Sequence, residues 1–135
     1  MAYPRHALWV EWEIRCRARA LRWSRFAEIA AMLRQQAGRN EPVALWSFEG
    51  YHAYATEAVS DASIYWQDSA HFNTEFGNVM LDEMFGVKPA LIGKNLSAAG
   101  VSVANLEREE RNERTAYLAA HPDFHATLQS VTGQK

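Results

Sequence analysis

Cysteine and long apolar runs are scarce in this chain. The sequence has a single cysteine, Cys16, among 135 residues, which excludes an intramolecular disulfide and a zinc site built from cysteines. No apolar run approaches the roughly 20 residues that a helix needs to span a bilayer. Residues 1–6 lack the apolar stretch of a signal peptide. We therefore expect a cytoplasmic protein with no membrane partner.

The sequence also lacks a strong excess of charge of either sign. Its formal net charge is −2, which gives no general attraction to nucleic acid or to an anionic membrane. One local run is basic and consists of Arg15, Arg17, Arg19, Arg22 and Arg25. The simpler interpretation of this run is a solvated turn and helix face, and the alternative is a site for an anionic ligand or partner. Because no nucleic-acid-binding motif accompanies it, we predict no nucleic-acid partner.

The short motifs of several large enzyme classes are missing as well. The sequence has no glycine-rich phosphate loop, no G-x-S-x-G nucleophile motif and no H-E-x-x-H metal motif. Glu11 and Glu13 could bind a metal or act as a pair of bases, but two carboxylates at a surface or rim are the simpler interpretation. We therefore predict no metal site.

What the sequence does contain is a pattern of strands. Residues 7–16 alternate between apolar and polar positions, which is typical of a strand with one buried face. The residues on that face would be Leu8, Val10, Trp12, Ile14 and Cys16. Residues 43–48 and 51–59 predict a second and a third strand, and residues 90–93 a short fourth strand.

Three helices are expected between and after these strands. Residues 26–37 carry apolar side chains at i, i+3, i+4, i+7 and i+11, which predicts an amphipathic helix. A central helix is expected from about Ile64 to Met80, after a turn at Ser60-Asp61 that supplies its N-cap. A polar helix over residues 105–120 would form an arm on its own domain or on a partner's.

The order β-α-β-β-α-β is the split βαβ arrangement of a ferredoxin-like α+β fold with a four-stranded antiparallel sheet. Its helices cover one sheet face, so a second copy would cover the other and form a dimeric α+β barrel with a cavity in each subunit. We predict a barrel domain over residues 1–96 and a C-terminal loop and helical arm over residues 97–135. The protein would be a homodimer.

Three segments carry a resemblance to a known family. They are the opening W-V-E-W-E-I-R, the pair E-P at residues 41–42, and E-A-V-S-D-A-S-I-Y-W-Q-D-S-A-H-F at residues 57–72. On these segments the chain resembles the dimeric α+β barrel superfamily, in particular antibiotic biosynthesis monooxygenase-like proteins, over about residues 7–96. The resemblance implies a cofactor-independent monooxygenase acting on a small aromatic, quinol or polyketide-like substrate. The first predicted strand has no asparagine, which the heme-degrading branch uses, and this argues against heme breakdown.

Such an enzyme needs a dry cavity with a base. Its substrate supplies electrons to O₂ once deprotonated, so the protein has to exclude water, hold the ring and stabilise the developing oxyanion. Aromatic, imidazole and amide side chains of the central helix and the strands could do this. The predicted catalytic residues are His71, Trp66 and Tyr65. The predicted substrate-binding residues are His52, Tyr54, Asn73 and Trp46.

Each of these residues also has a structural interpretation. His71 lies beside the apolar stripe and could be a structural histidine, and His52 could be a solvated turn residue. Trp66 and Tyr65 are adjacent in sequence, so they cannot both point inward. The alternative functions are a non-catalytic small-ligand-binding or accessory protein of the same fold, and a heme-binding protein with His71 as axial ligand.

Overall fold

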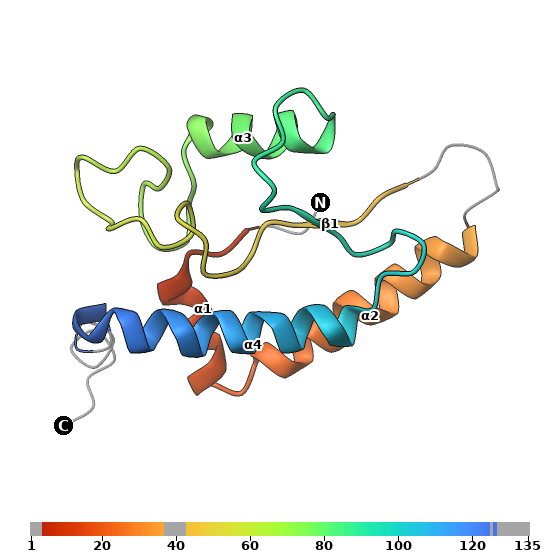
Figure 1. Ribbon diagram of the computed structural model, residues 1–135, viewed down its shortest axis with the longest axis horizontal. Helices are drawn as coiled ribbons and strands as arrows, with labels where there is room; N and C mark the ends of the chain where they lie inside the picture. The colour runs from red at the N-terminus through yellow and green to blue at the C-terminus, as the bar shows by residue number, and fades with distance from the viewer. Residues whose placement is uncertain (1–3, 37–42, 125, 127–135) are drawn as a thin grey trace.

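The computed structural model describes residues 4–36, 43–124 and 126. Its elements in chain order are α1 (Ala7–Arg15), α2 (Arg19–Gln36), β1 (Trp46–Ser47), α3 (Thr74–Met84), β2 (Lys94–Asn95) and α4 (Val103–Ala120). β1 and β2 form an antiparallel pair in which Trp46 faces Asn95. Helices α1, α2 and α4 lie on one side of this strand pair, and α3 lies on the other (Figure 1).

The predicted four-stranded ferredoxin-like sheet is wrong. The described part of the chain forms one sheet of two strands, each two residues long. The dimeric α+β barrel is therefore wrong as well, because no broad sheet face is present there for a second copy to cover. β1 lies inside the predicted second strand, residues 43–48, and β2 follows directly after the predicted fourth strand, residues 90–93. The predicted third strand, residues 51–59, folds into turns, in which the Ala55 N–H donates to the His52 carbonyl at 3.0 Å.

The predicted first strand, residues 7–16, forms the helix α1. His6 caps its N-terminus, because the imidazole Nδ1 accepts a hydrogen bond from the Leu8 N–H at 3.1 Å. The buried residues of this helix are Ala7, Val10, Glu11 and Glu13. Trp12, which the alternating pattern places inward, is 48% exposed. The pattern misleads because carboxylates that have buried partners face the interior alongside the apolar groups.

Two of the three predicted helices are confirmed. The amphipathic helix predicted over residues 26–37 is part of α2, which begins earlier, at Arg19. Residues 37–42 lie outside the described residues. The polar helix predicted over residues 105–120 is α4, which packs against α2 of the same chain.

The predicted central helix, from Ile64 to Met80, is wrong over its first half. Helix α3 begins at Thr74, and the preceding ten residues form a loop closed by a bridge between Trp66 and Phe72. Glu57 holds the start of this loop, because its carboxylate accepts the backbone N–H of Ile64 at 2.8 Å. Backbone groups that a helix would pair internally are thereby used by side chains.

Three apolar clusters join these elements. The first connects α2 to the strand pair and to the start of α4, and contains Trp23, Phe26, Ala30, Leu45, Leu96 and Val103. The second packs α3 on the loop before it, and contains Phe48, Trp66, Phe76 and Met80. The third connects α1 to the end of α4, and contains Ala7, Val10 and Tyr51, with Ile14, Tyr117 and Phe124 packed against them. The helical layer is thus held at both ends of α4.

Candidate functional site

The three predicted catalytic residues do not converge on a shared space. Trp66 is 1% exposed, and its Nε1 donates to the Tyr54 carbonyl at 2.6 Å, so its ring is part of the core beneath α3. Tyr65 is half-buried and packs edge-on against the Tyr54 ring, with the ring centroids 4.7 Å apart. His71 is exposed on the loop before α3. None of the three lines either of the two cavities described below.

The position of His71 follows from the geometry of its loop. Asp68 Oδ1 accepts the backbone N–H groups of Ala70 at 2.7 Å and of His71 at 2.8 Å, and the His71 Nδ1 donates to Asp68 Oδ2 at 2.8 Å. The hydrogen bond from His71 is the main reason why the pKa of Asp68 lies below its ordinary value. Both side chains are exposed, so the pair shapes a surface loop.

Three of the four predicted substrate-binding residues are used within the fold. Tyr54 stacks on Phe76 with ring centroids 5.8 Å apart, and Trp46 packs against the same aromatic cluster. The Asn73 Nδ2 donates to the Ile64 carbonyl at 3.1 Å, which ties the start of α3 to the preceding loop. These side chains fill space and satisfy backbone groups.

His52 is a predicted binding residue that does line a cavity, but both nitrogens of its imidazole are engaged. Nδ1 accepts the Ala55 N–H at 3.2 Å, so Nε2 carries the proton and donates it to the Phe48 carbonyl at 3.1 Å. Burial lowers the pKa of His52 below its ordinary value. The cavity has a volume of about 200 Å³ and is lined by Glu49, Tyr51, His52, Ile92, Lys94 and Glu113. A neutral imidazole with two backbone partners is a structural group rather than a base.

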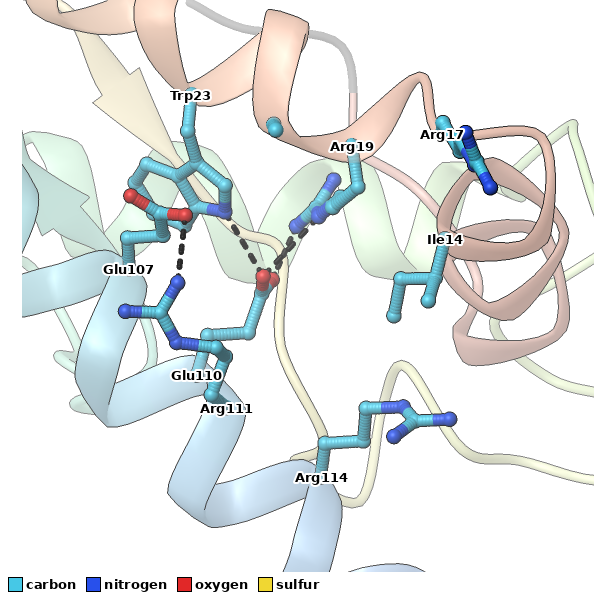
Figure 2. A pocket seen from close by; sticks show the side chains of 9 residues that line it. Ile14, Arg17, Arg19, Trp23, Glu107, Glu110, Arg111 and Arg114 are labelled. Carbon is cyan, nitrogen blue, oxygen red and sulfur yellow. Dashed lines mark hydrogen bonds and ion pairs between the residues drawn. The ribbon is translucent and has the colours of Figure 1, made fainter.

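A larger cavity, of about 350 Å³, lies beside the corner between α1 and α2. We name it the arginine cavity and define it by its lining residues: Ile14, Arg17, Arg19, Ala20, Trp23, Glu107, Glu110, Arg111 and Arg114. Figure 2 shows that these side chains come from three segments: the end of α1 with the following turn, the start of α2, and α4. Four arginines thus surround a space whose other walls include a tryptophan and an isoleucine.

Arg19 is the centre of the charge network behind this cavity. It is 6% exposed, and its Nη1 donates to Glu13 at 3.0 Å and to Glu49 at 2.7 Å. Its Nε donates to Glu110 at 3.0 Å, and its Nη2 pairs with the same carboxylate. Trp23 Nε1 also donates to Glu110, at 2.9 Å (Figure 2). Burial alone would lower the pKa of Arg19, but the attraction of Glu49 and Glu110 outweighs it and raises the pKa above its ordinary value.

A second set of contacts ties α4 to α1. Arg114 donates from Nε and Nη2 to the two oxygens of buried Glu11, at 2.6 and 2.7 Å. The Tyr51 hydroxyl donates to Glu11 at 2.7 Å, and burial, followed by the charge of Glu11, raises the pKa of Tyr51. On α4 itself, Arg111 Nη1 donates to Glu107 at 2.8 Å. Both carboxylates that line the arginine cavity are therefore bonded to arginines.

Arg17 differs from the other lining arginines. Its side chain is exposed, and no hydrogen bond or ion pair within the described chain joins its guanidinium to another residue. Its backbone is left-handed, with φ 58°, and it follows the C-cap of α1. The Arg17 N–H donates to the Ile14 carbonyl at 3.1 Å and the Ala18 N–H to the Glu13 carbonyl at 2.8 Å, which is a Schellman motif. Glycine is the usual residue at this position, and the left-handed conformation costs other residues about 1 kcal/mol.

The sequence pointed to part of this site. The basic run, interpreted either as a solvated face or as an anion site, contains the lining residues Arg17 and Arg19. Glu110 was missed because the charged run of α4 does not distinguish it from its exposed neighbours. A usable signal was its spacing: Glu110 is seven residues after Val103 and seven before Tyr117, and so lies on the apolar face of α4.

No protein-family model, curated protein or solved structure matches the chain. The resemblance to monooxygenase-like proteins therefore stays a prediction. In the residues that the structure describes, no helix has the length and apolar character to cross a membrane. The same residues contain no group of three or more histidine, cysteine, aspartate or glutamate side chains that could hold a metal ion.

Proposed function

We propose that the protein binds a small organic molecule in the arginine cavity. The observation that carries the proposal is the cavity volume of about 350 Å³, which lies within the roughly 300–1,000 Å³ typical of small-ligand pockets. Ile14, Ala20 and Trp23 supply apolar walls. Apolar walls with a few fixed polar groups are typical of sites that bury a small molecule and orient it.

The charge network supports this proposal because it fixes the walls before a ligand arrives. The contacts of Arg19 with Glu110 and of Arg114 with Glu11 connect α4 to α2 and to α1. Both contacts use two nitrogens of one guanidinium, which restricts the orientation of each side chain. A preformed pocket loses less conformational entropy on binding, so more of the contact energy appears as affinity.

The same contacts favour binding over catalysis. Glu107 and Glu110 are the lining carboxylates, and a general base has to reach a substrate proton directly. Glu107 instead accepts a hydrogen bond from Arg111, and Glu110 accepts hydrogen bonds from Arg19 and Trp23. Both carboxylates are therefore already engaged by neighbouring side chains, Glu107 within α4 and Glu110 between α4 and α2. We infer a binding or accessory protein, and not one that transforms its ligand.

Thermal unfolding in the presence of small aromatic and aliphatic compounds tests the proposal. A ligand at 100 times its Kd stabilises the folded state by about 2.7 kcal/mol, which corresponds to a rise of about 10 °C in Tm for a domain of this size. The variant Ala20→Phe places a ring in the cavity without removing a polar contact, and should abolish the rise. Ala27→Phe is the matched control, since Ala27 is an exposed residue of α2 that does not line the cavity.

Two results would contradict the proposal. One is a panel in which no compound raises Tm, and the other is a rise that Ala20→Phe leaves unchanged. The monooxygenase suggested by the resemblance predicts something different, namely consumption of O₂ with a quinol or phenol. Oxygen uptake that His71→Ala abolishes and Ala20→Phe preserves would favour that enzyme and a site near the α3 loop.

A further inference from the structure

We infer that the ligand of the arginine cavity is an organic anion, whose charged head Arg17 binds while its apolar body contacts Ile14 and Trp23. This inference rests on the proposed function and adds the chemical class of the ligand. It depends on the distribution of charge in the cavity and on the presence of Arg17, which has no partner among the described residues, in the cavity lining.

The charge of the cavity favours an anion because its carboxylates are already engaged. Glu107 bonds to Arg111, and Glu110 bonds to Arg19 and Trp23, whereas Arg17 has no partner within the described residues. A cationic ligand would meet four arginines, and both lining carboxylates are already paired with arginine. A guanidinium presents a planar fork of N–H donors that matches the two oxygens of a carboxylate or the oxygens of a phosphate. An anionic head beside Arg17 would therefore give this guanidinium the anionic partner that it lacks within the described residues.

The backbone position of Arg17 bears on the same question. The Schellman position favours glycine, and the chain places glycine at two other left-handed positions, Gly86 with φ 69° and Gly100 with φ 79°. Leu91, which is 87% exposed, is also left-handed, with φ 57°. The structural alternative is that a cation after α1 interacts with the negative end of the helix dipole. Arg15 already supplies that charge in the last turn of α1. The left-handed backbone is therefore not by itself a sign of a ligand, and the inference depends on the guanidinium of Arg17, which lines the cavity without a partner among the described residues.

Isothermal titration with three matched compounds tests the inference. We choose 2-naphthoate, its neutral isostere 2-naphthamide, and 2-naphthyl phosphate. The wild-type protein should bind 2-naphthoate at least tenfold more tightly than the amide, because an ionic pair replaces a neutral contact. The preference should weaken with added salt. Tighter binding of the phosphate than of the carboxylate would support an anion and assign its head as a phosphate.

The variant Arg17→Gly separates ligand binding from stability. It removes the guanidinium and relieves the left-handed backbone, so Tm should stay the same or rise while the preference for the anion disappears. Arg17→Lys keeps the charge but not the planar fork, and should lose part of the preference. Arg25→Gln is the control, because Arg25 is an exposed arginine of α2 outside the cavity. This variant should bind 2-naphthoate with the affinity of the wild type.

The inference and the proposed function fail in different ways. Equal affinity for 2-naphthoate and 2-naphthamide, or full affinity for 2-naphthoate in Arg17→Gly, would overturn the anion and leave the binding function standing. Binding of none of the three compounds would also overturn the inference, and the wider thermal screen then decides the function. Binding that Ala20→Phe does not reduce would overturn both.

Discussion

Replacing Arg19 by methionine should destabilise the protein strongly. Methionine keeps an unbranched side chain of similar length but removes the charge and every donor. The carboxylates of Glu13, Glu49 and Glu110 are each less than 10% exposed and all contact this guanidinium. In the variant they would be left close together without their shared cation, and little of their surface is open to water.

The size of the effect follows from the burial of these groups. Removing one partner of a buried ion pair costs about 3–5 kcal/mol, because the remaining charge is left without compensation. A domain of this size has a total free energy of unfolding of about 5–15 kcal/mol. The loss should therefore lower Tm by about 10–20 °C. Arg22 still contacts Glu49, and Trp23 still donates to Glu110, so we expect a folded but much weaker protein.

Urea unfolding followed by far-ultraviolet circular dichroism measures this loss against a matched variant. Arg25→Met makes the same substitution on the same helix, where Arg25 pairs with Glu28 and both side chains are more than half exposed. Exposed pairs of this kind contribute about 0.3–0.5 kcal/mol. If the free energies of unfolding of the two variants agree within about 1 kcal/mol, then the network around Arg19 does not stabilise the fold.

Three further predictions concern single contacts. Tyr51→Phe removes the hydroxyl that donates to buried Glu11 and should cost about 1–3 kcal/mol in urea unfolding; no measurable cost would mean that the contact is absent in solution. Ser102→Ala removes the N-cap of α4 and should cost about 0.5–2 kcal/mol, and an unchanged Tm would contradict the capping role. Burial lowers the pKa values of both His6 and His52, so their folded forms are neutral. Their contribution to stability is complete above the unfolded pKa of about 6.5 and is lost as the pH falls below it. A free energy of unfolding that is flat between about pH 7.5 and 5.5 would refute this.

The helices with a clear apolar period were predictable, and the shortest one was not. The pattern of Phe26, Ile29, Ala30 and Leu33 fits a helix and no strand, and α2 confirms it. α1 has nine residues, over which alternating and helical patterns share several positions. The two patterns differ in whether Glu11 faces the interior, as it does in the helix. That depends on Arg114, which is 103 positions away from Glu11 and invisible to any local pattern.

The site was harder to predict than the fold because its residues come from distant segments. The aromatic residues Trp66, Tyr65 and Tyr54 looked like a binding site in sequence, yet Trp66 and Tyr54 both pack on Phe76 of α3 and fill the space themselves. The arginine run gave a true signal, but its interpretation required α4 to lie beside it. A basic run forms a solvated face unless another element packs against it. The sequence alone does not show that α4 packs there.

The pairing of the first helices with the last one has a consequence for synthesis on the ribosome. Arg19 and Glu110 are separated by 91 positions, so the glutamate is added late in translation. At about 5–20 residues per second, roughly 5–20 s pass before the arginine can meet it. During that interval Arg19 can pair with Glu13 and Glu49 but not with Glu110. Glu11 lacks its partner Arg114 for the same reason, so a ribosome that stalls before α4 would carry a nascent chain whose charge network is incomplete.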